Sequence, residues 1–396
     1  MNLQKRIVVT IAVALALAGI FLRAYVLARL SQDDLCGSDF PIFYAGGQLA
    51  GSPELYSAAA VRRIELREAG CTQPPALFVR PPYFAAMMKP WARLPFWTSF
   101  FLWRMATVLA AGVFVWLWPA PRHWSLLACA WSMPLAYAIT IGQDSGLLLL
   151  WMALGVTLLA RKRDFAAGLA LSMCAAKFHL FLLLPLLLIS RRKALYGGAT
   201  GAALLLAACF AVQGPHWIGP FLGAISDPTI NPKPDSFFNL WGIAHGHTGI
   251  EILLALPVVI SVVYVIQRAD FGLGLAAVLA GGLLLSHHQT ASDAVLLAPV
   301  ALTLCTDPRI RYAKVVVVFL ASPVAYFLMV SPGAWEVPRL LLLLMVLMIA
   351  WDVRCSFRSP SGTNASKAIG FDRQAPAARE LTEAPDGPAR ATCVKV

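Results

Sequence analysis

Long apolar stretches alternate with short polar ones along most of the chain. Such stretches need surroundings as apolar as themselves, and the core of a bilayer accommodates about 20 of these residues per helix. Strands or loops exposed to lipid would leave backbone groups without hydrogen bonds, so helices are expected. The pattern predicts an all-α polytopic membrane protein, with apolar runs at residues 7–22, 105–118, 194–212, 252–266 and 340–350.

Three stretches are too polar or too rich in proline to lie in hydrocarbon: residues 31–94, 213–248 and 352–396. The rest of the chain is long enough for about twelve helices of about 20 residues each. We therefore expect a transmembrane domain at residues 1–351, with the first two polar stretches as external loops. The third, rich in Pro, Gly, Ser and mixed charge, is expected to be a disordered cytoplasmic tail.

Composition supports this class of protein and excludes another. Hydrophobic residues make up 59% of the chain and charged residues 13%, and the mean hydropathy is +0.70. Soluble domains carry about 25% charged residues, so a soluble enzyme is excluded. The net charge of +12, from 32 basic and 20 acidic residues, accompanies no nucleic-acid-binding motif, so we read it as a topology signal and expect no nucleic-acid partner.

Basic clusters flank the predicted spans, and placing all of them in the cytoplasm requires an even number of crossings between them. The segment 164–190 decides the count, because it has basic clusters at both ends and Lys177 and His179 in its middle. A single span would put Lys177 at mid-bilayer and one cluster on the wrong side. We therefore predict a hairpin of two short helices, with Lys177 and His179 at its external apex.

The remaining polar positions near the membrane gather on the same predicted side. Alternation of the spans places Gln143, His288 and Asp293 at external turns, together with the hairpin apex. Each residue alone could be a polar group that reaches toward water at the interface. Ionisable residues within spans are costly and usually mark a pathway or a site, so the set predicts one outward-facing polar chamber.

The loop 31–94 is predicted to contain two short helices. Ser52 before Pro53 is typical of a helix start, and Gly70 of a helix end. Asp39, close to the first helix, has two explanations. Its short carboxylate could cap that helix, or it could take a proton from a sugar hydroxyl as a general base.

Cys36 and Cys71 are the only cysteines of this loop, whereas the other cysteines fall in spans or on the cytoplasmic side. In an oxidising compartment two loop thiols are expected to pair, which predicts a Cys36–Cys71 disulfide.

A metal site formed by His287, His288 and Asp293 is an alternative use of the external turn that carries these residues. Adjacent histidines point to different sides of a helix, so we expect no metal.

Several short motifs occur in the order found in one enzyme family. They are Ser38-Asp39-Phe40, Arg80-Pro81-Pro82, Gly142-Gln143-Asp144-Ser145, Lys177-Phe178-His179, the loop 235–242, and the segment from Ser286 to Pro299. On these motifs the chain resembles glycosyltransferase family 87 over roughly residues 35–350, although it departs from the family pattern at Arg80, Ser145, Leu180 and His287.

The resemblance implies a C-type glycosyltransferase with many membrane helices and helical external loops. It implies a polyprenyl-phosphate donor carrying mannose, another hexose or arabinofuranose, and a glycolipid or glycan acceptor. The active site would face the external, periplasmic side of the plasma (inner) membrane, and no cofactor would be needed.

In such an enzyme Asp39 would be the catalytic base of an inverting transfer. The donor phosphate and substrate would be bound by Lys177, His179, Gln143, Arg80, His288 and Asp293. Two other classes of function remain open at this point. About twelve spans with polar residues inside also suit a secondary transporter or a flippase of lipid-linked sugars, and a membrane scaffold or sensor would need no polar chamber.

Overall fold

The computed structural model describes residues 3–27, 36, 38–71, 77–228, 238–331 and 333–358. The predicted tail beyond Arg358 and part of the loop 235–242 lie outside these residues. Within the described part the chain is helical and contains no strand. The last helix continues to Arg358, so the first residues of the segment predicted as a tail extend that helix.

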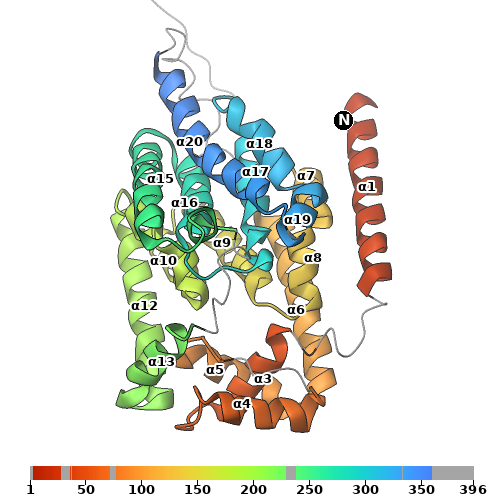
Figure 1. Cartoon of the computed structure of the whole chain (residues 1–396). Coiled ribbons are helices and arrows are strands. Elements are labelled where there is room, and N and C mark those ends of the chain that lie inside the picture. Colours follow the sequence, from red (N-terminus) through yellow and green to blue (C-terminus); the bar gives the residue numbers. More distant parts are fainter. Residues whose placement is uncertain are drawn as a thin grey trace, which may run out of the picture.

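The first half of the chain builds the loop layer and half of the bundle (Figure 1). Its α-helices are α1 (Leu3–Leu27), α3 (Asp39–Leu49), α4 (Ala58–Ile64), α5 (Pro82–Met88), α6 (Phe96–Leu117), α7 (Arg122–Trp131), α8 (Met133–Thr140), α9 (Ser145–Ala160), α10 (Asp164–Ser172) and α11 (Leu184–Leu188). Shorter helical turns are η1 (Glu65–Ala69), η2 (Trp91–Arg93) and η3 (Met173–Phe181).

The second half completes the bundle. Its α-helices are α12 (Arg192–Gln213), α13 (Ile218–Ile225), α14 (Leu240–Ile243), α15 (Thr248–Arg268), α16 (Phe271–Leu285), α17 (Leu297–Thr306), α18 (Tyr312–Leu320), α19 (Pro323–Val330) and α20 (Glu336–Arg358). Two 3₁₀ turns accompany them, η4 (Pro215–Trp217) and η6 (Ala291–Leu296). Helix α16 is buried on all sides from Gly272 to Leu284, which explains why it is apolar around its whole circumference.

Four helices, α6, α12, α15 and α20, are long and apolar enough to span a membrane. The number rises to six if the bent pairs α8 with α9 and α18 with α19 are each one span. Shorter apolar helices lie at Arg6–Ile20, Phe271–Leu285 and Ala291–Thr306. The expectation of about twelve spans assumed about 20 residues for each, and many helices of this bundle are shorter than that.

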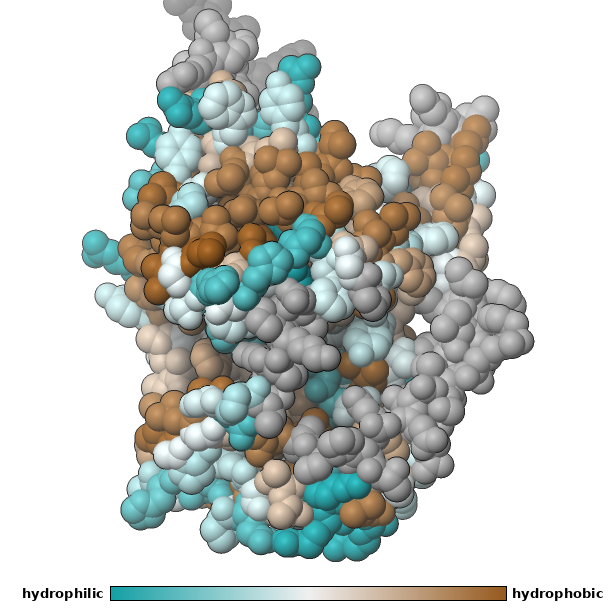
Figure 2. All heavy atoms as spheres, in the orientation of Figure 1, coloured by the Kyte–Doolittle hydropathy of each residue, from teal (hydrophilic) through white to brown (hydrophobic). Residues whose placement is uncertain are grey.

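The molecule has two ends of different chemistry. Helices α3, α4, α5 and α13 lie at one end, called here the loop face (Figure 1). The opposite end, called the basic face, holds the ends of the helices that carry Arg191 and Arg309. Arg191 lies 3.7 Å from Asp164, and Arg309 pairs with Asp270. Figure 2 shows apolar surface over the bundle between hydrophilic ends, as expected for a bilayer protein.

The segment 164–190 forms the predicted hairpin. Helix α10 leaves the basic face, η3 breaks at Lys177, whose φ of −125° and ψ of 56° are not helical, and α11 returns. Glycines let this hairpin pack closely on α12. A Cβ at Gly168 would lie 2.0 Å from the carbonyl oxygen of Ala194, and one at Gly197 would lie 2.0 Å from that of Phe165. Small residues therefore permit the close helix contact.

The loop face has a core of its own, separate from that of the bundle. Aromatic residues of α3, α5 and α6 pack together there, among them Phe40, Phe84 and Phe100, which are buried. Phe40 lies 4.9 Å from Phe100 between ring centroids. The disulfide Cys36–Cys71, with Cα atoms 5.1 Å apart, closes this layer. The described residues of the loop thus form a layer packed against the bundle.

One helix boundary in this layer was predicted incorrectly. The second loop helix begins at Ala58, where the Ser57 side chain accepts a hydrogen bond from the backbone N–H of Ala60. Ser52 instead stabilises a turn, because its hydroxyl accepts from the N–H of Glu54. Either serine could cap a helix by its local chemistry. Hydrogen-bonded turns follow Leu49, so the helix begins only after Ser57. Gly70 ends the helix as expected, with a φ of 69°.

Candidate functional site

The candidate site lies where the loop layer meets the bundle, and Asp39 stands at its edge. Asp39 is the first residue of α3, and its carboxylate Oδ2 accepts a hydrogen bond of 2.5 Å from Nε2 of Gln143. The N-cap position belongs to Ser38, and no side chain caps the helix. Asp39 therefore does not cap this helix, and its carboxylate contacts a side chain of the bundle.

A sharp turn between α8 and α9 presents Gln143 to Asp39. The two helices are bent by 120°, and Gly142 adopts a φ of +64° in the turn. A Cβ there would lie 2.6 Å from the Cβ of Phe40, so glycine is required both by conformation and by space. The indole N–H of Trp103 donates to the Gly142 carbonyl at 2.8 Å, and the N–H of Phe40 donates to Ile141 at 3.3 Å.

Arg80 binds the next residue of this turn, Asp144, through one edge of its guanidinium. Its Nε lies 3.1 Å from Oδ2 of Asp144, and its Nη2 lies 3.0 Å from Oδ1. The same Nη2 donates to Oε1 of Gln143 at 3.3 Å. Both charged side chains are buried, and a bidentate charge-assisted pair fixes orientation as well as distance. Arg80 thereby links the loop layer to the α8–α9 turn.

Lys177 brings the hairpin apex to the same cluster. Its Nζ lies 3.4 Å from Asp144 Oδ1, donates to the Ser145 hydroxyl at 2.8 Å and pairs with Oδ1 of Asp293. Ser145 in turn donates to Asp293 Oδ1 at 2.9 Å. All three donor positions of the ammonium therefore face oxygen atoms. The ammonium is buried, and its contacts with these oxygen atoms explain how its charge is tolerated inside the bundle.

The turn between α16 and η6 completes the cluster through Asp293. The N–H and the hydroxyl of Thr290 donate to Asp293 Oδ2 at 2.9 and 3.2 Å. The Thr290 side chain also accepts from the backbone N–H of Asp293, which completes a capping box at the start of η6. Asn239 holds the preceding turn, because its side-chain amide donates to the carbonyl of Ser286 at 2.6 Å. Asp293 is therefore fixed by backbone and side chain before any substrate binds.

His179 and His288 lie beside these charges. Their ring centroids are 6.0 Å apart with the rings nearly perpendicular. Nε2 of His179 is buried and has no hydrogen-bond partner among the described residues. His287 points elsewhere, since its Nδ1 lies 3.2 Å from Glu251 and its ring packs on Trp241. His179 and His288 thus belong to the site, and His287 lies at its periphery.

The cluster holds more negative than positive side chains. Asp39, Asp144 and Asp293 face Arg80 and Lys177, so one carboxylate lacks a matching cation when all five are ionised. Asp39 is the acid without a bonded cation among the described residues. Burial raises its pKa, while the charges of Lys177 and Arg80 oppose that rise. A carboxylate of raised pKa is a stronger base, which suits proton abstraction.

Comparison with known proteins gives one result. The model of glycosyltransferase family 87 matches residues 78–323. The chain belongs to glycosyltransferase family 87. No curated protein and no solved structure matches it.

Membership identifies the chain as a glycosyltransferase that acts on a sugar donor and an acceptor, and its apolar helices indicate a membrane protein. This assignment disfavours the transporter, flippase and scaffold alternatives. The family match covers the turns that carry Gln143, Lys177 and Asp293, together with Arg80 and both histidines. It begins after Asp39, so the case for Asp39 rests on its contact with Gln143.

The structure brings together every predicted site residue, and it adds two that sequence reasoning did not select. Asp144 joins Arg80 to Lys177, and Ser145 bridges Lys177 to Asp293. Both belong to the turn that carries Gln143, but an acidic or hydroxyl residue in a turn is common. Arg80 was the residue that could have predicted Asp144. It is a cation at a position where the family pattern differs, and a buried cation needs an anion nearby.

The described residues contain no group of three or more His, Cys, Asp or Glu side chains placed to hold a metal. The alternative site of His287, His288 and Asp293 is not assembled. His287 faces Glu251, whereas Asp293 is occupied by Lys177, Ser145 and Thr290.

Proposed function

We propose that this protein is an inverting membrane glycosyltransferase. It transfers a sugar from a polyprenyl-phosphate donor to an acceptor hydroxyl of a glycolipid or glycan at the external face of the plasma membrane. The observation that carries the proposal is the contact of Asp39 with Gln143, directly beside the buried cluster of Arg80, Asp144, Lys177 and Asp293.

Asp39 is proposed as the general base. Its carboxylate takes the proton of the acceptor hydroxyl while that oxygen forms a bond to the anomeric carbon. The bond from this carbon to the phosphate oxygen breaks on the opposite side, and polyprenyl phosphate leaves with the electron pair. One displacement inverts the anomeric configuration. Gln143 orients the base, because its amide donates to one carboxylate oxygen and leaves the other for the acceptor.

Arg80 and Lys177 are proposed to stabilise the leaving phosphate. Lys177 already contacts three oxygen atoms, so it acts mainly through its charge. Arg80 binds Asp144 and Gln143 through Nε and Nη2. Its Nη1 has no hydrogen bond to the described residues, which makes it the donor for a phosphate oxygen. His179 and His288, beside Lys177, would bind the phosphate or the sugar.

The external location of the site is supported by two independent features. The basic clusters around Arg163, Arg191 and Arg309 gather at the opposite face, and such clusters favour the cytoplasm. The Cys36–Cys71 disulfide lies on the same face as the site, and disulfides persist in oxidising compartments. Both features support a periplasmic location of the loop face.

Short helices are proposed to set the depth of the site. Helix α16 has 15 residues and is about 22 Å long, whereas a bilayer core is about 30 Å thick. Its end near Ser286 therefore lies below the external surface of the membrane. A donor phosphate can reach this depth while its tail stays in lipid.

Purified full-length protein in lipid nanodiscs, incubated with a panel of polyprenyl-phosphate sugars, tests the proposal. Release of polyprenyl phosphate is measured for the wild type, for Asp39→Asn and for Glu54→Gln. Glu54 is a loop carboxylate that pairs with Arg63 on the surface. Asp39→Asn is expected to reduce kcat by about 10²–10⁴-fold, because the amide cannot accept the proton. Glu54→Gln should keep wild-type activity.

Two results would reject parts of this scheme. Wild-type turnover by a folded Asp39→Asn protein would remove Asp39 as the base. A wild-type enzyme that consumes none of the lipid-linked donors, but consumes a nucleotide sugar, would refute the donor class. The configuration of the product, read by NMR, separates inversion from retention.

A further inference from the structure

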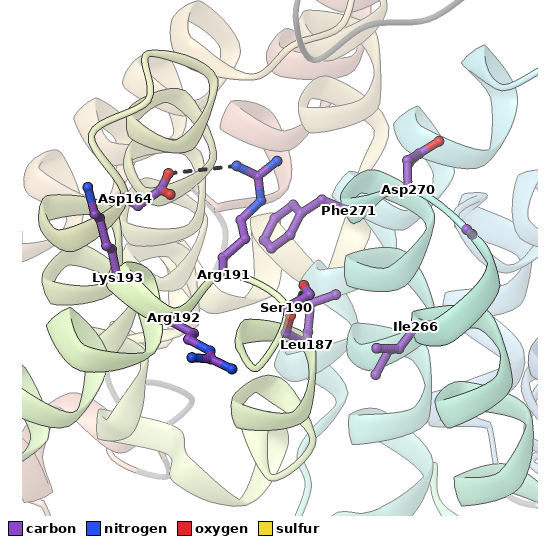
Figure 3. Close-up of a pocket in the computed structure, with 10 residues that line it drawn as sticks. Asp164, Leu187, Ser190, Arg191, Arg192, Lys193, Ile266, Asp270 and Phe271 are labelled. Atoms are coloured by element: carbon purple, nitrogen blue, oxygen red, sulfur yellow. Dashed lines mark hydrogen bonds and ion pairs between the residues drawn. The ribbon is translucent and has the colours of Figure 1, made fainter. Parts of the chain in front are cut away.

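A cavity lies at the basic face, at the opposite end of the bundle from Asp39. Its volume is about 600 Å³, within the range of small-molecule sites. It forms where α10, α12 and α16 begin and where α11 and α15 end (Figure 3). The glycosyl transfer proposed above uses none of its lining residues, which are Asp164, Leu187, Ser190, Arg191, Arg192, Lys193, Ile266, Ala269, Asp270 and Phe271.

The acidic residues of this cavity already have cationic partners. Asp164 lies 3.7 Å from Nη1 of Arg191, and Asp270 pairs with Arg309. Arg191 is held on a second side, since its guanidinium lies over the ring of Phe271 at 5.6 Å. Figure 3 shows Arg191 between Asp164 and Phe271. The acids therefore orient Arg191 and do not neutralise the rest of the basic lining.

Arg192 and Lys193 supply the excess positive charge. Both are exposed, and neither has an ion pair within the described residues. The five charged lining residues sum to one net positive charge, and Arg309, outside the lining, is shared between Asp270 and Asp307. Three consecutive cations around a cavity favour an anion that accepts several hydrogen bonds.

The opposite wall of the cavity is apolar and continuous with the lipid-facing surface. Leu187, Ile266 and Phe271 line it, and Ile189 next to it is 57% exposed. Helix α12 begins at this cavity and helix α15 ends there, and both are long enough to span the membrane. A polar rim above an apolar wall at the membrane surface matches a molecule with a charged head and an apolar tail.

We propose that this cavity binds the phosphate-bearing headgroup of an anionic membrane phospholipid. The phosphate contacts Arg192 and Lys193, with Arg191 fixed at its side, and the acyl chains follow α12 and α15 into the bilayer. The two ends of the α10–α11 hairpin, Asp164 and Ser190, both line the cavity. The bound lipid thereby braces the base of the hairpin whose apex carries Lys177.

Full-length protein in nanodiscs of phosphatidylcholine with a graded fraction of phosphatidylglycerol tests this site. Lipid that remains bound is counted by native mass spectrometry after release from the nanodisc. The pocket variant is Arg192→Gln with Lys193→Gln. The control variant, Arg161→Gln with Lys162→Gln, removes the same charge from exposed residues of the same face outside the cavity.

The wild type is expected to retain phosphatidylglycerol in preference to phosphatidylcholine. The pocket variant should bind phosphatidylglycerol about 30-fold more weakly, since each basic residue near an anionic surface contributes about 1 kcal/mol. The control variant should stay close to the wild type. All four substituted residues are exposed, so both variants are expected to fold.

Three outcomes would overturn the proposal. An equal loss in the control variant would show attraction by general surface charge. Equal retention of phosphatidylcholine would show that no anion is selected. Displacement of the lipid by millimolar inorganic phosphate, with binding of phosphate to lipid-free protein in detergent, would identify free phosphate as the ligand. The assay contains no sugar donor, so its result is independent of the proposed glycosyl transfer.

Discussion

The buried pair between Arg80 and Asp144 gives the sharpest test of how the site is held together. Its two contacts measure 3.0 and 3.1 Å, and the side chains are 7% and 2% exposed. We consider the substitution Arg80→Met, which keeps an unbranched side chain and removes the cation. Asp144 then retains Lys177 at 3.4 Å as its remaining charged partner.

The charge balance of the cluster sets the size of the effect. With all groups ionised, the wild type has three carboxylates against two cations, and Arg80→Met leaves three against one. Removing one member of a buried ion pair costs about 3–5 kcal/mol, because the other charge stays buried without its partner. The variant Arg80→Met with Asp144→Asn restores the original imbalance of one charge. The double variant should therefore be less destabilised than the sum of the two single variants.

Thermal unfolding in one detergent, followed by tryptophan fluorescence, measures these differences. With about 2 °C per kcal/mol, Arg80→Met should lower the apparent Tm by about 6–10 °C. The control is Arg63→Met, which breaks the surface pair with Glu54, whose side chains are 63% and 50% exposed. Such a pair contributes less than about 1 kcal/mol. Equal shifts for Arg80→Met and Arg63→Met, or strictly additive effects in the double variant, would refute the reasoning.

Three further predictions concern the loop layer and its contact with the bundle. Burial raises the pKa of Glu65 to about 7, so the folded state holds this proton more tightly than the unfolded state. This contribution to stability, up to about 3 kcal/mol, is lost as pH rises from about 4.5 to 7. Glu65→Gln should flatten the dependence of Tm on pH in this window, and an unchanged profile would contradict the assignment. Gly142 has a φ of +64°, and the Cβ added by Gly142→Ala would lie 2.6 Å from the Cβ of Phe40. The variant should destabilise the protein by about 1–3 kcal/mol and lower kcat by moving Asp39. Wild-type Tm and turnover would show that the turn tolerates a side chain. Cys36→Ser opens a loop of 35 residues and should cost about 3–4 kcal/mol of stability. Reduction of the wild-type disulfide should cause the same loss. A Tm that does not respond to reductant would argue against the disulfide.

The sequence by itself determined the class of the protein and the location of its polar residues along the chain. Apolar runs are local features, and the bilayer requirement for helices converts them directly into structure. The charge asymmetry of the loops was enough to predict the hairpin 164–190, and the structure breaks the helix at Lys177 as that hairpin requires. The helix end at Gly70 followed from chemistry within one turn.

Local chemistry failed where two solutions were equally good in the sequence. Ser52 and Ser57 can both cap a helix, and the hydrogen bonds of the preceding turns selected Ser57. Asp39 could cap or act as a base, and the structure gives the N-cap position to Ser38, while the Asp39 carboxylate contacts Gln143, 104 positions away. The length of each span was also undetermined, because helices buried within a bundle can end below the membrane surface.

Only the tertiary structure decided which charges pair. Asp144 meets Arg80 from 64 positions away, and Asp293 meets Lys177 from 116 positions away. Hydropathy placed these residues at turns on one face, but every cation there had several possible acidic partners. The choice depends on the 120° bend at Gly142 and on the close packing of the hairpin against α12, which bring three distant turns within hydrogen-bonding distance. Electrostatic partners are fixed by distances of a few ångströms, and those distances exist only after the helices have packed.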